Sequence, residues 1–106
     1  MGLTVDVTVS DGVAVLVLKG EVDATSAGQL NQRILEVSEQ PLRELMLNAS
    51  ELTYLSSAGL RCLVYAHQRL GRKVRIVLAG ASPEVADTIR MAGFDRSITM
   101  RERAGM

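Results

Sequence analysis

The amino-acid sequence predicts an α/β fold: a single domain in which one mixed β-sheet carries helices packed mainly on one face, in the order β-β-α-β-α-β-α-β. Short apolar runs typical of strands alternate with segments whose apolar residues recur at helical spacing. Strand–helix–strand units favour right-handed crossovers and parallel pairing, whereas only a tight turn separates the first two strands. The length of 106 residues fits one domain.

The first two strands are expected to form a β-hairpin. Apolar and polar residues alternate strictly over residues 3–10, a period of two that indicates a half-buried strand. Asp11-Gly12 then provides a tight-turn signal, because glycine adopts positive φ without strain. The continuous apolar run over residues 13–18 is typical of a strand covered on both faces.

A first helix is predicted from Ala24 onward, where the apolar period becomes helical. Its apolar stripe consists of Ala27, Leu30, Ile34 and Val37. Asp23 suits the N-cap, since its carboxylate can accept hydrogen bonds from the unpaired first N–H groups, and Pro41 should end the segment.

A short buried strand and a second helix follow. The strand covers residues 45–47 and should end at the polar residues 48–50. Residues 51–56 are interpreted as a loop that two buried side chains, Leu52 and Tyr54, hold in place. The helix is expected to begin near Ser56-Ser57 and to end at Gly71.

The last part of the chain predicts a strand over residues 73–79, a third helix and a short strand over residues 98–100. Ser82, Pro83 and Glu84 form a strong helix start, with a capping hydroxyl, a proline at the first position and an acid near the positive end of the dipole. This helix should bury Val85, Ile89 and Ala92 and end at Gly93.

The domain is assigned to residues 1–100. Residues 101–106 are interpreted as a polar C-terminal tail.

The charge balance argues against a nucleic-acid or anionic-membrane binder. Lys plus Arg and Asp plus Glu both number 12, so the formal net charge is zero, whereas such binders usually show a basic excess. The one dense basic cluster comprises Arg69, Arg72, Lys73 and Arg75. A solvated helix end explains it better than phosphate binding does.

The single cysteine and single histidine limit metal and redox chemistry. Cys62 has no partner for an internal disulfide, and Cys62 with His67 cannot build a zinc site alone, so we expect no metal and no cofactor. No stretch reaches the roughly 18 apolar residues of a membrane span, and no secretory leader pattern is present. A soluble, cytoplasmic protein is expected.

The sequence favours a protein that is not an enzyme. It contains neither of the two common nucleotide-binding glycine loops and no nucleophile-elbow motif. His67 lies beside the apolar stripe of the second helix and is interpreted as a partly buried structural histidine, and Cys62 as a core-facing thiol. A hydrolase remains the third alternative, and it would need His67 to reach a serine.

Two hydroxyl groups, Ser56 and Ser57, lie where a loop enters the second helix, followed by the small residues Ala58 and Gly59. The first N–H groups of a helix lack partners within the helix and carry the positive end of its dipole. A serine at such a place can cap the helix. It can also accept a phosphate, since small neighbours leave its hydroxyl reachable. The residues alone leave both uses open.

Three motifs give the chain a family resemblance. They are Gly20-Glu21-Val22-Asp23 after the second strand, residues 45–50 with 54–60 as a strand–loop–serine–helix signature, and Met91-Ala92-Gly93-Phe94 at the end of the third helix. In this order and spacing the chain resembles, over nearly its whole length, the STAS family, the domain of sulfate transporters and anti-sigma factor antagonists. The resemblance implies a STAS-like fold.

The resemblance also implies a transcription regulator that works by partner switching. Single-domain members bind an anti-sigma factor, often also a histidine-kinase-like serine kinase, until phosphorylation of the signature serine releases them, and a serine phosphatase restores binding. The acceptor corresponds to Ser57, with Ser56 as a competing acceptor. The implied partner-binding residues are Asp23, Ser56, Ser57, Ala58 and Gly59.

Two positions depart from the family pattern. Asn48 and Ser56 stand where the family often has aspartate, which removes negative charge and alters complementarity with a basic partner. Asn48 can still make the loop hydrogen bonds of an aspartate. The alternative function is a small-molecule- or anion-sensing STAS domain that serves a transporter or signalling complex, in which the serine–helix junction binds an anion or nucleotide.

Overall fold

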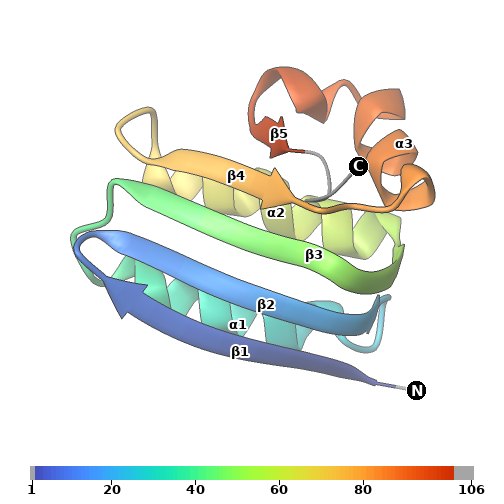
Figure 1. Cartoon of the computed structure of the whole chain (residues 1–106), viewed down its shortest axis with the longest axis horizontal. Helices are drawn as coiled ribbons and strands as arrows, with labels where there is room; N and C mark the ends of the chain where they lie inside the picture. The colour runs from blue at the N-terminus through green and yellow to red at the C-terminus, as the bar shows by residue number, and fades with distance from the viewer. Residues whose placement is uncertain (1, 102–106) are drawn as a thin grey trace.

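The computed structural model describes residues 2–101, which form a five-stranded sheet, three α-helices and one short 3-10 helix (Figure 1). The element bounds are β1 Leu3–Ser10, β2 Val13–Val22, α1 Ala27–Ser38, β3 Glu44–Leu55, α2 Ser57–Leu70, β4 Arg75–Ala79, α3 Pro83–Met91, η1 Phe94–Arg96 and β5 Thr99–Arg101. The predicted α/β class and element order are confirmed.

The sheet is mixed and has the strand order β1-β2-β3-β4-β5. β1 and β2 pair antiparallel as the predicted hairpin, and β2, β3, β4 and β5 run parallel. At the hairpin turn Asp11 has a φ of 53° and Gly12 a φ of 78°. Positive φ at both central residues matches the right-handed twist of the flanking strands.

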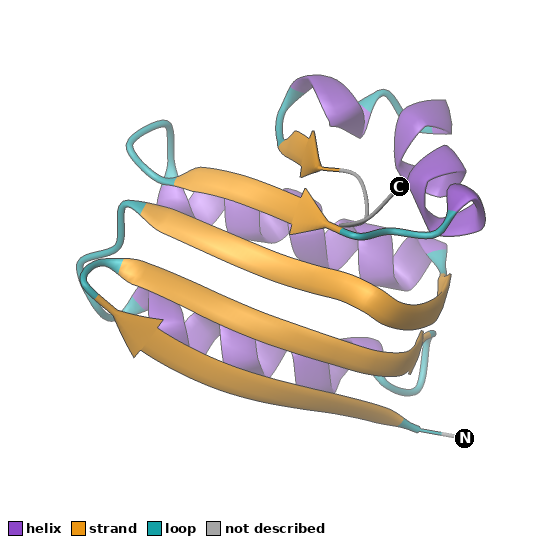
Figure 2. Cartoon of the chain, in the orientation of Figure 1, coloured by secondary structure: helices purple, strands orange, loops and turns teal. Residues whose placement is uncertain are grey.

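α1 and α2 cover one face of the sheet, α3 lies beyond the end of β4, and η1 connects α3 to β5 (Figure 2). The core lies between the sheet and the helices, and its fully buried side chains include Leu16, Leu18, Leu30, Ile34, Leu45, Leu47, Leu63, Leu78 and Ile89. Helices on one main face agree with the sequence prediction.

Residues 13–18 were expected to be covered on both faces, and this expectation is wrong. Ala14, Leu16 and Leu18 are buried under the helices, but Val13, Val15 and Val17 are only half-buried. These valines point to the face on which the described part of the chain places no helix (Figure 2). A continuous apolar run therefore marks a central strand here without indicating a second covering layer.

β3 is much longer than predicted, and the expected loop over residues 51–56 is in fact mostly strand. β3 continues to Leu55 and pairs with β2 as far as Val22, with irregular register near Lys19 and Gly20. Leu52 and Leu55 are both buried although they are three positions apart, so the strict alternation that identifies a strand is lost. Tyr54, predicted as a buried anchor, is 51% exposed.

The helix boundaries follow the capping signals more closely than the apolar periodicity. α2 begins at Ser57 and stops at Gly71, and Ser82 caps α3 by accepting the Val85 N–H at 3.3 Å, all as predicted. α1 begins at Ala27, after a turn, and not at Ala24.

The C-terminal part differs from prediction in detail. Ala92 is exposed at the end of α3 and not buried, because Gly93, with a φ of 74°, turns the chain and Phe94 enters the core instead. The last strand is shifted by one residue, to Thr99–Arg101. The predicted polar tail lies outside the described residues apart from Arg101.

Gly20, the first residue of the Gly-Glu-Val-Asp motif, lies where β2 passes the start of β1. Its φ is 107°, and a Cβ atom at this position would overlap the backbone carbonyl oxygen of Gly2. Backbone cannot move aside as a flexible side chain can. The motif therefore requires glycine here for a reason of packing and conformation.

We expect Gly20→Ala to lower the free energy of unfolding by about 2 kcal/mol or more, from the strained φ and the overlap. Gly28→Ala is the matched control: it lies in α1, no atom lies within 4 Å of its added Cβ, and it should raise stability by up to about 1 kcal/mol. Urea unfolding of both variants measures this. Equal midpoints would contradict the packing argument.

Candidate functional site

The candidate site lies at the edge of the sheet where the parallel strands β2 and β3 end. Val22 and Leu55, the last residues of the two strands, are register partners. The Ser56 N–H donates to the Val22 carbonyl at 2.8 Å and extends the pairing by one residue. Two chain segments, one beginning at Asp23 and the other at Ser57, therefore start from paired backbone positions at the ends of these neighbouring strands.

Asp23 makes the capping hydrogen bonds that the sequence predicted, but it makes them in the turn that leads into α1, because the helix itself begins only at Ala27. Its Oδ1 accepts hydrogen bonds from the Thr25 N–H at 2.9 Å, the Thr25 hydroxyl at 2.7 Å and the Ser26 N–H at 3.1 Å. The helix N-cap residue is Ser26, whose side chain makes no capping bond. The sequence signal for such a turn is an aspartate followed two and three positions later by the hydroxyl residues Thr25 and Ser26.

The turn stabilises the ionised form of the Asp23 carboxyl group. The hydrogen bond from the Thr25 hydroxyl, followed by that from the Thr25 N–H, lowers the pKa of the Asp23 carboxyl below its ordinary value. Hydrogen bonds to a carboxylate favour its ionised form. An aspartate is ionised at neutral pH in any case, and these bonds keep Asp23 ionised to lower pH, so the site presents a negative charge beside the start of α2.

Ser56 and Ser57 have different roles. Ser56 is the half-buried N-cap residue of α2, and its Oγ accepts the Gly59 N–H at 3.3 Å. Ser57 is the first residue of the helix and is exposed, and its side chain makes no hydrogen bond within residues 2–101. Of the two hydroxyl groups, that of Ser57 is the one that capping leaves available to solvent.

Gly59 faces the core and not the serine hydroxyl. A Cβ atom on Gly59 would lie 2.6 Å from Leu55 Cδ1 and 2.7 Å from Val22 Cγ1. Glycine here allows the start of α2 to approach the ends of β2 and β3 closely. Ala58 is half-buried and is the small neighbour that the site itself presents.

Two exposed residues lie near Ser57: Tyr54, whose exposure sequence reasoning did not predict, and Arg61, which it missed. Tyr54, the register partner of Glu21, exposes half of its side chain near the end of β3. Arg61 is exposed one helical turn after Ser57 and forms no ion pair with any described residue. Ser57 and Arg61 are four positions apart, and this spacing in a predicted helix already indicates that they are neighbours on one face.

Asn48 makes the loop hydrogen bonds expected of an asparagine that stands in the place of an aspartate. Its Oδ1 accepts hydrogen bonds from the Ser50 N–H at 3.1 Å and from the Ser50 hydroxyl at 2.7 Å. An aspartate carboxylate would accept the same two bonds. The substitution therefore keeps the local geometry of β3 and removes only the charge.

The other chemically versatile residues lie apart from this site. Cys62 is buried, its thiol donates to the Ala27 carbonyl at 3.2 Å, and burial raises its pKa, as expected for a core-facing thiol. His67 is half-buried, and its ring meets that of Phe94 edge-on at 6.0 Å. Ser57 and His67 are ten residues apart on one helix, about 15 Å along its axis, so they cannot act as a nucleophile and its base.

The described residues contain no group of three or more histidine, cysteine or acidic side chains placed to hold a metal ion. Within residues 2–101, every helix is too short or too polar to cross a membrane.

We expect Thr25→Val to raise the pKa of Asp23 towards its ordinary value, because the hydroxyl makes the strongest hydrogen bond to the carboxylate. Carboxyl carbon NMR titration of both proteins measures this. A depressed pKa contributes stability above the unfolded-state pKa and loses it as pH falls through the folded-state value. The stability difference between the parent protein and Asp23→Asn should therefore shrink in acid. An unchanged pKa in Thr25→Val would contradict this assignment.

Comparisons with known proteins agree with this architecture. The protein is 29% identical over 98 residues to the anti-sigma-F factor antagonist RsfB of Mycobacterium tuberculosis, covering 92% of this chain and 80% of that protein. It is 32% identical over 96 residues to BtrV of Bordetella bronchiseptica, described as a candidate anti-sigma factor antagonist, covering 89% of this chain and 80% of BtrV.

A solved structure has the same fold over almost the whole chain. The crystal structure of an anti-sigma factor antagonist from Mycobacterium paratuberculosis superposes with a TM-score of 0.87 at 27% identity, covering 94% of this chain and 86% of that one. The STAS domain family matches residues 4–105. The chain therefore belongs to the STAS domain family.

Proposed function

We propose that this protein is a cytoplasmic anti-sigma factor antagonist that works by partner switching, with Ser57 as its phosphorylation site. The observation that carries the proposal is the exposed Ser57 hydroxyl at the first turn of α2, beside the ionised Asp23 turn. The names of the relatives RsfB and BtrV support the same class of partner, an anti-sigma factor. The protein itself is a binding module and not an enzyme.

The partner-binding surface comprises Asp23, Ser56, Ser57 and Ala58. Gly59 lies beneath it and contributes by letting α2 approach the sheet. Tyr54 extends the surface with an exposed aromatic ring, the kind of side chain that often anchors protein interfaces. The fixed carboxylate of Asp23 favours a partner surface that presents a basic group at this position.

The switch is a reversible phosphoryl transfer. A histidine-kinase-like serine kinase, which is also the anti-sigma factor, transfers the γ-phosphoryl group of ATP to Ser57 Oγ and releases ADP and a proton. A serine phosphatase hydrolyses the phosphoserine with water and returns serine and inorganic phosphate. The antagonist contributes an accessible hydroxyl and a surface that positions it.

Phosphorylation acts at the interface and leaves the fold unchanged. In the free protein a phosphate on Ser57 lies in solvent at the positive end of the α2 dipole, where about two negative charges are tolerated. In the complex the same group would be buried against the partner. An uncompensated buried charge costs several kcal/mol, and every 1.4 kcal/mol changes affinity tenfold. Release therefore requires no conformational change.

We expect Ser57→Ala to bind the anti-sigma factor constitutively, even with ATP present, because the acceptor hydroxyl is missing. Ser57→Asp should bind at least tenfold more weakly, since it places a fixed charge at the interface. Calorimetric titration with the purified partner measures both affinities. Equal affinities of the two variants would overturn the interface mechanism.

Ser56→Ala is the matched control for the site of modification. It removes the adjacent hydroxyl and the capping bond to Gly59, which should cost about 1 kcal/mol of stability. The variant should still incorporate one phosphate from ATP, as measured by intact mass spectrometry. Phosphorylation of Ser57→Ala, or its loss in folded Ser56→Ala, would move the site to Ser56.

We also expect Arg61 to be the counter-ion of the phosphorylated Ser57. An acid four residues before a base is the favourable order for an ion pair on a helix, worth about 0.3–0.5 kcal/mol. In the phosphorylated protein, Arg61→Gln should therefore raise the second pKa of the phosphoserine by about 0.3. Phosphorus NMR titration measures this.

The control is Arg69→Gln, the same charge loss two helical turns further along α2. It should leave the phosphoserine pKa where it is in the parent protein. Equal shifts in the two variants would assign the effect to net charge and not to pairing.

A further inference from the structure

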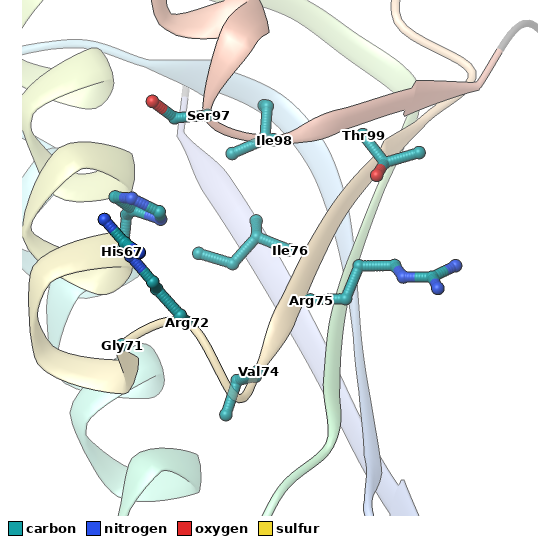
Figure 3. Close-up of a pocket in the computed structure, with 9 residues that line it drawn as sticks. All are labelled: His67, Gly71, Arg72, Val74, Arg75, Ile76, Ser97, Ile98 and Thr99. Carbon is teal, nitrogen blue, oxygen red and sulfur yellow. The ribbon is translucent and has the colours of Figure 1, made fainter.

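A pocket lies at the opposite end of α2 from Ser57. It has a volume of about 330 Å³ and lies between the end of α2, the start of β4 and the segment that leads from η1 into β5 (Figure 3). α2 has 14 residues and so spans about 20 Å, which separates this pocket from the proposed phosphorylation site. Partner switching at Ser57 makes no use of it.

The lining of this pocket divides into an apolar part and a polar part. Val74, Ile76 and Ile98 supply apolar side chains near its centre (Figure 3). On the side of α2, the Arg72 side chain extends along the helix towards His67, and Ser97 places a hydroxyl on the same side. A guanidinium, an imidazole and a hydroxyl can together donate several hydrogen bonds to one anionic group.

The positive charge of Arg72 is uncompensated. Arg72 forms no ion pair with any residue of the described range, and no aspartate or glutamate lines the pocket. Arg75 also borders it, but its side chain points away from Ile76 in Figure 3, and its register partner on β3 is Glu44. The basic cluster that the sequence singled out thus contributes one arginine to the polar side of a cavity.

We propose that this pocket binds a small phosphate monoester. The phosphate is held by Arg72 with His67 and Ser97, and a compact apolar or aromatic body packs over Ile76 and Ile98. A phosphate monoester offers three terminal oxygens, so it can accept a bidentate pair of hydrogen bonds from the guanidinium and a further bond from His67 or Ser97, whereas a carboxylate has only two oxygens. A volume near 300 Å³ is at the small end of ligand pockets, so the body is no larger than one or two rings.

The proposal is tested by NMR titration of the whole ¹⁵N-labelled chain with phenyl phosphate, with inorganic phosphate and phenol as separate arms. Phenyl phosphate should bind saturably and shift the amide signals of Gly71, Ile76 and Ile98. Inorganic phosphate should shift the same signals at higher concentration, and phenol should bind more weakly than phenyl phosphate. A lack of saturable binding, or shifts centred on Ser57, would overturn the proposal.

Arg72→Gln should weaken phenyl phosphate binding about tenfold, the loss expected for a charge-assisted hydrogen bond. Lys73→Gln is the matched control: it removes the same charge from the adjacent, exposed residue, which does not line the pocket, and should weaken binding less than twofold. Equal losses in the two variants would show diffuse attraction by the basic cluster and so overturn a defined site.

Discussion

The parallel pairing of β2 with β3 is the interaction on which the site depends. It continues beyond both strands through the 2.8 Å hydrogen bond from the Ser56 N–H to the Val22 carbonyl. This bond joins the Asp23 turn and the start of α2 to one rigid edge of the sheet. A hydrogen bond between backbone groups thereby holds together a binding surface built from two segments more than thirty residues apart.

Close packing around Gly59 completes this arrangement. Leu55 and Val22 are nearly or fully buried, and both lie against the Cα atom of Gly59. Because this glycine lets α2 sit directly on the strand ends, the cap residue Ser56 turns inward and the next residue, Ser57, turns outward. One serine is thus used to start the helix, and its neighbour remains available for chemistry.

Much of this could be predicted from the sequence, and the misses share a physical cause. Capping and turn residues located the hairpin, the start of α2 and the start of α3 to within a residue, because these signals act locally. The polar half of β3 has the pattern of a loop, since its buried leucines, Leu52 and Leu55, do not alternate. The burial of the β2 valines depends on whether another element packs on that face of the sheet, and the local sequence pattern does not predict this. The hydrogen bonds between Asp23 and Thr25 have a local signal in the sequence, because hydroxyl residues stand two and three positions after the aspartate.

The two ends of α2 show how a chain of zero net charge can present different electrostatic surfaces. At the N-terminal end the helix dipole is positive, and the exposed Ser57 hydroxyl leaves room for a negative group. At the C-terminal end His67 and Arg69 lie in the last turn, where positive charge opposes the negative end of the dipole. Arg72 lies beyond Gly71, but its side chain extends back along the helix towards His67 (Figure 3), so the negative end of the dipole favours its charge as well. The dipole therefore favours both Arg69 and Arg72, and an anion bound at this end of α2 would need the Arg72 guanidinium to offset the negative end of the dipole.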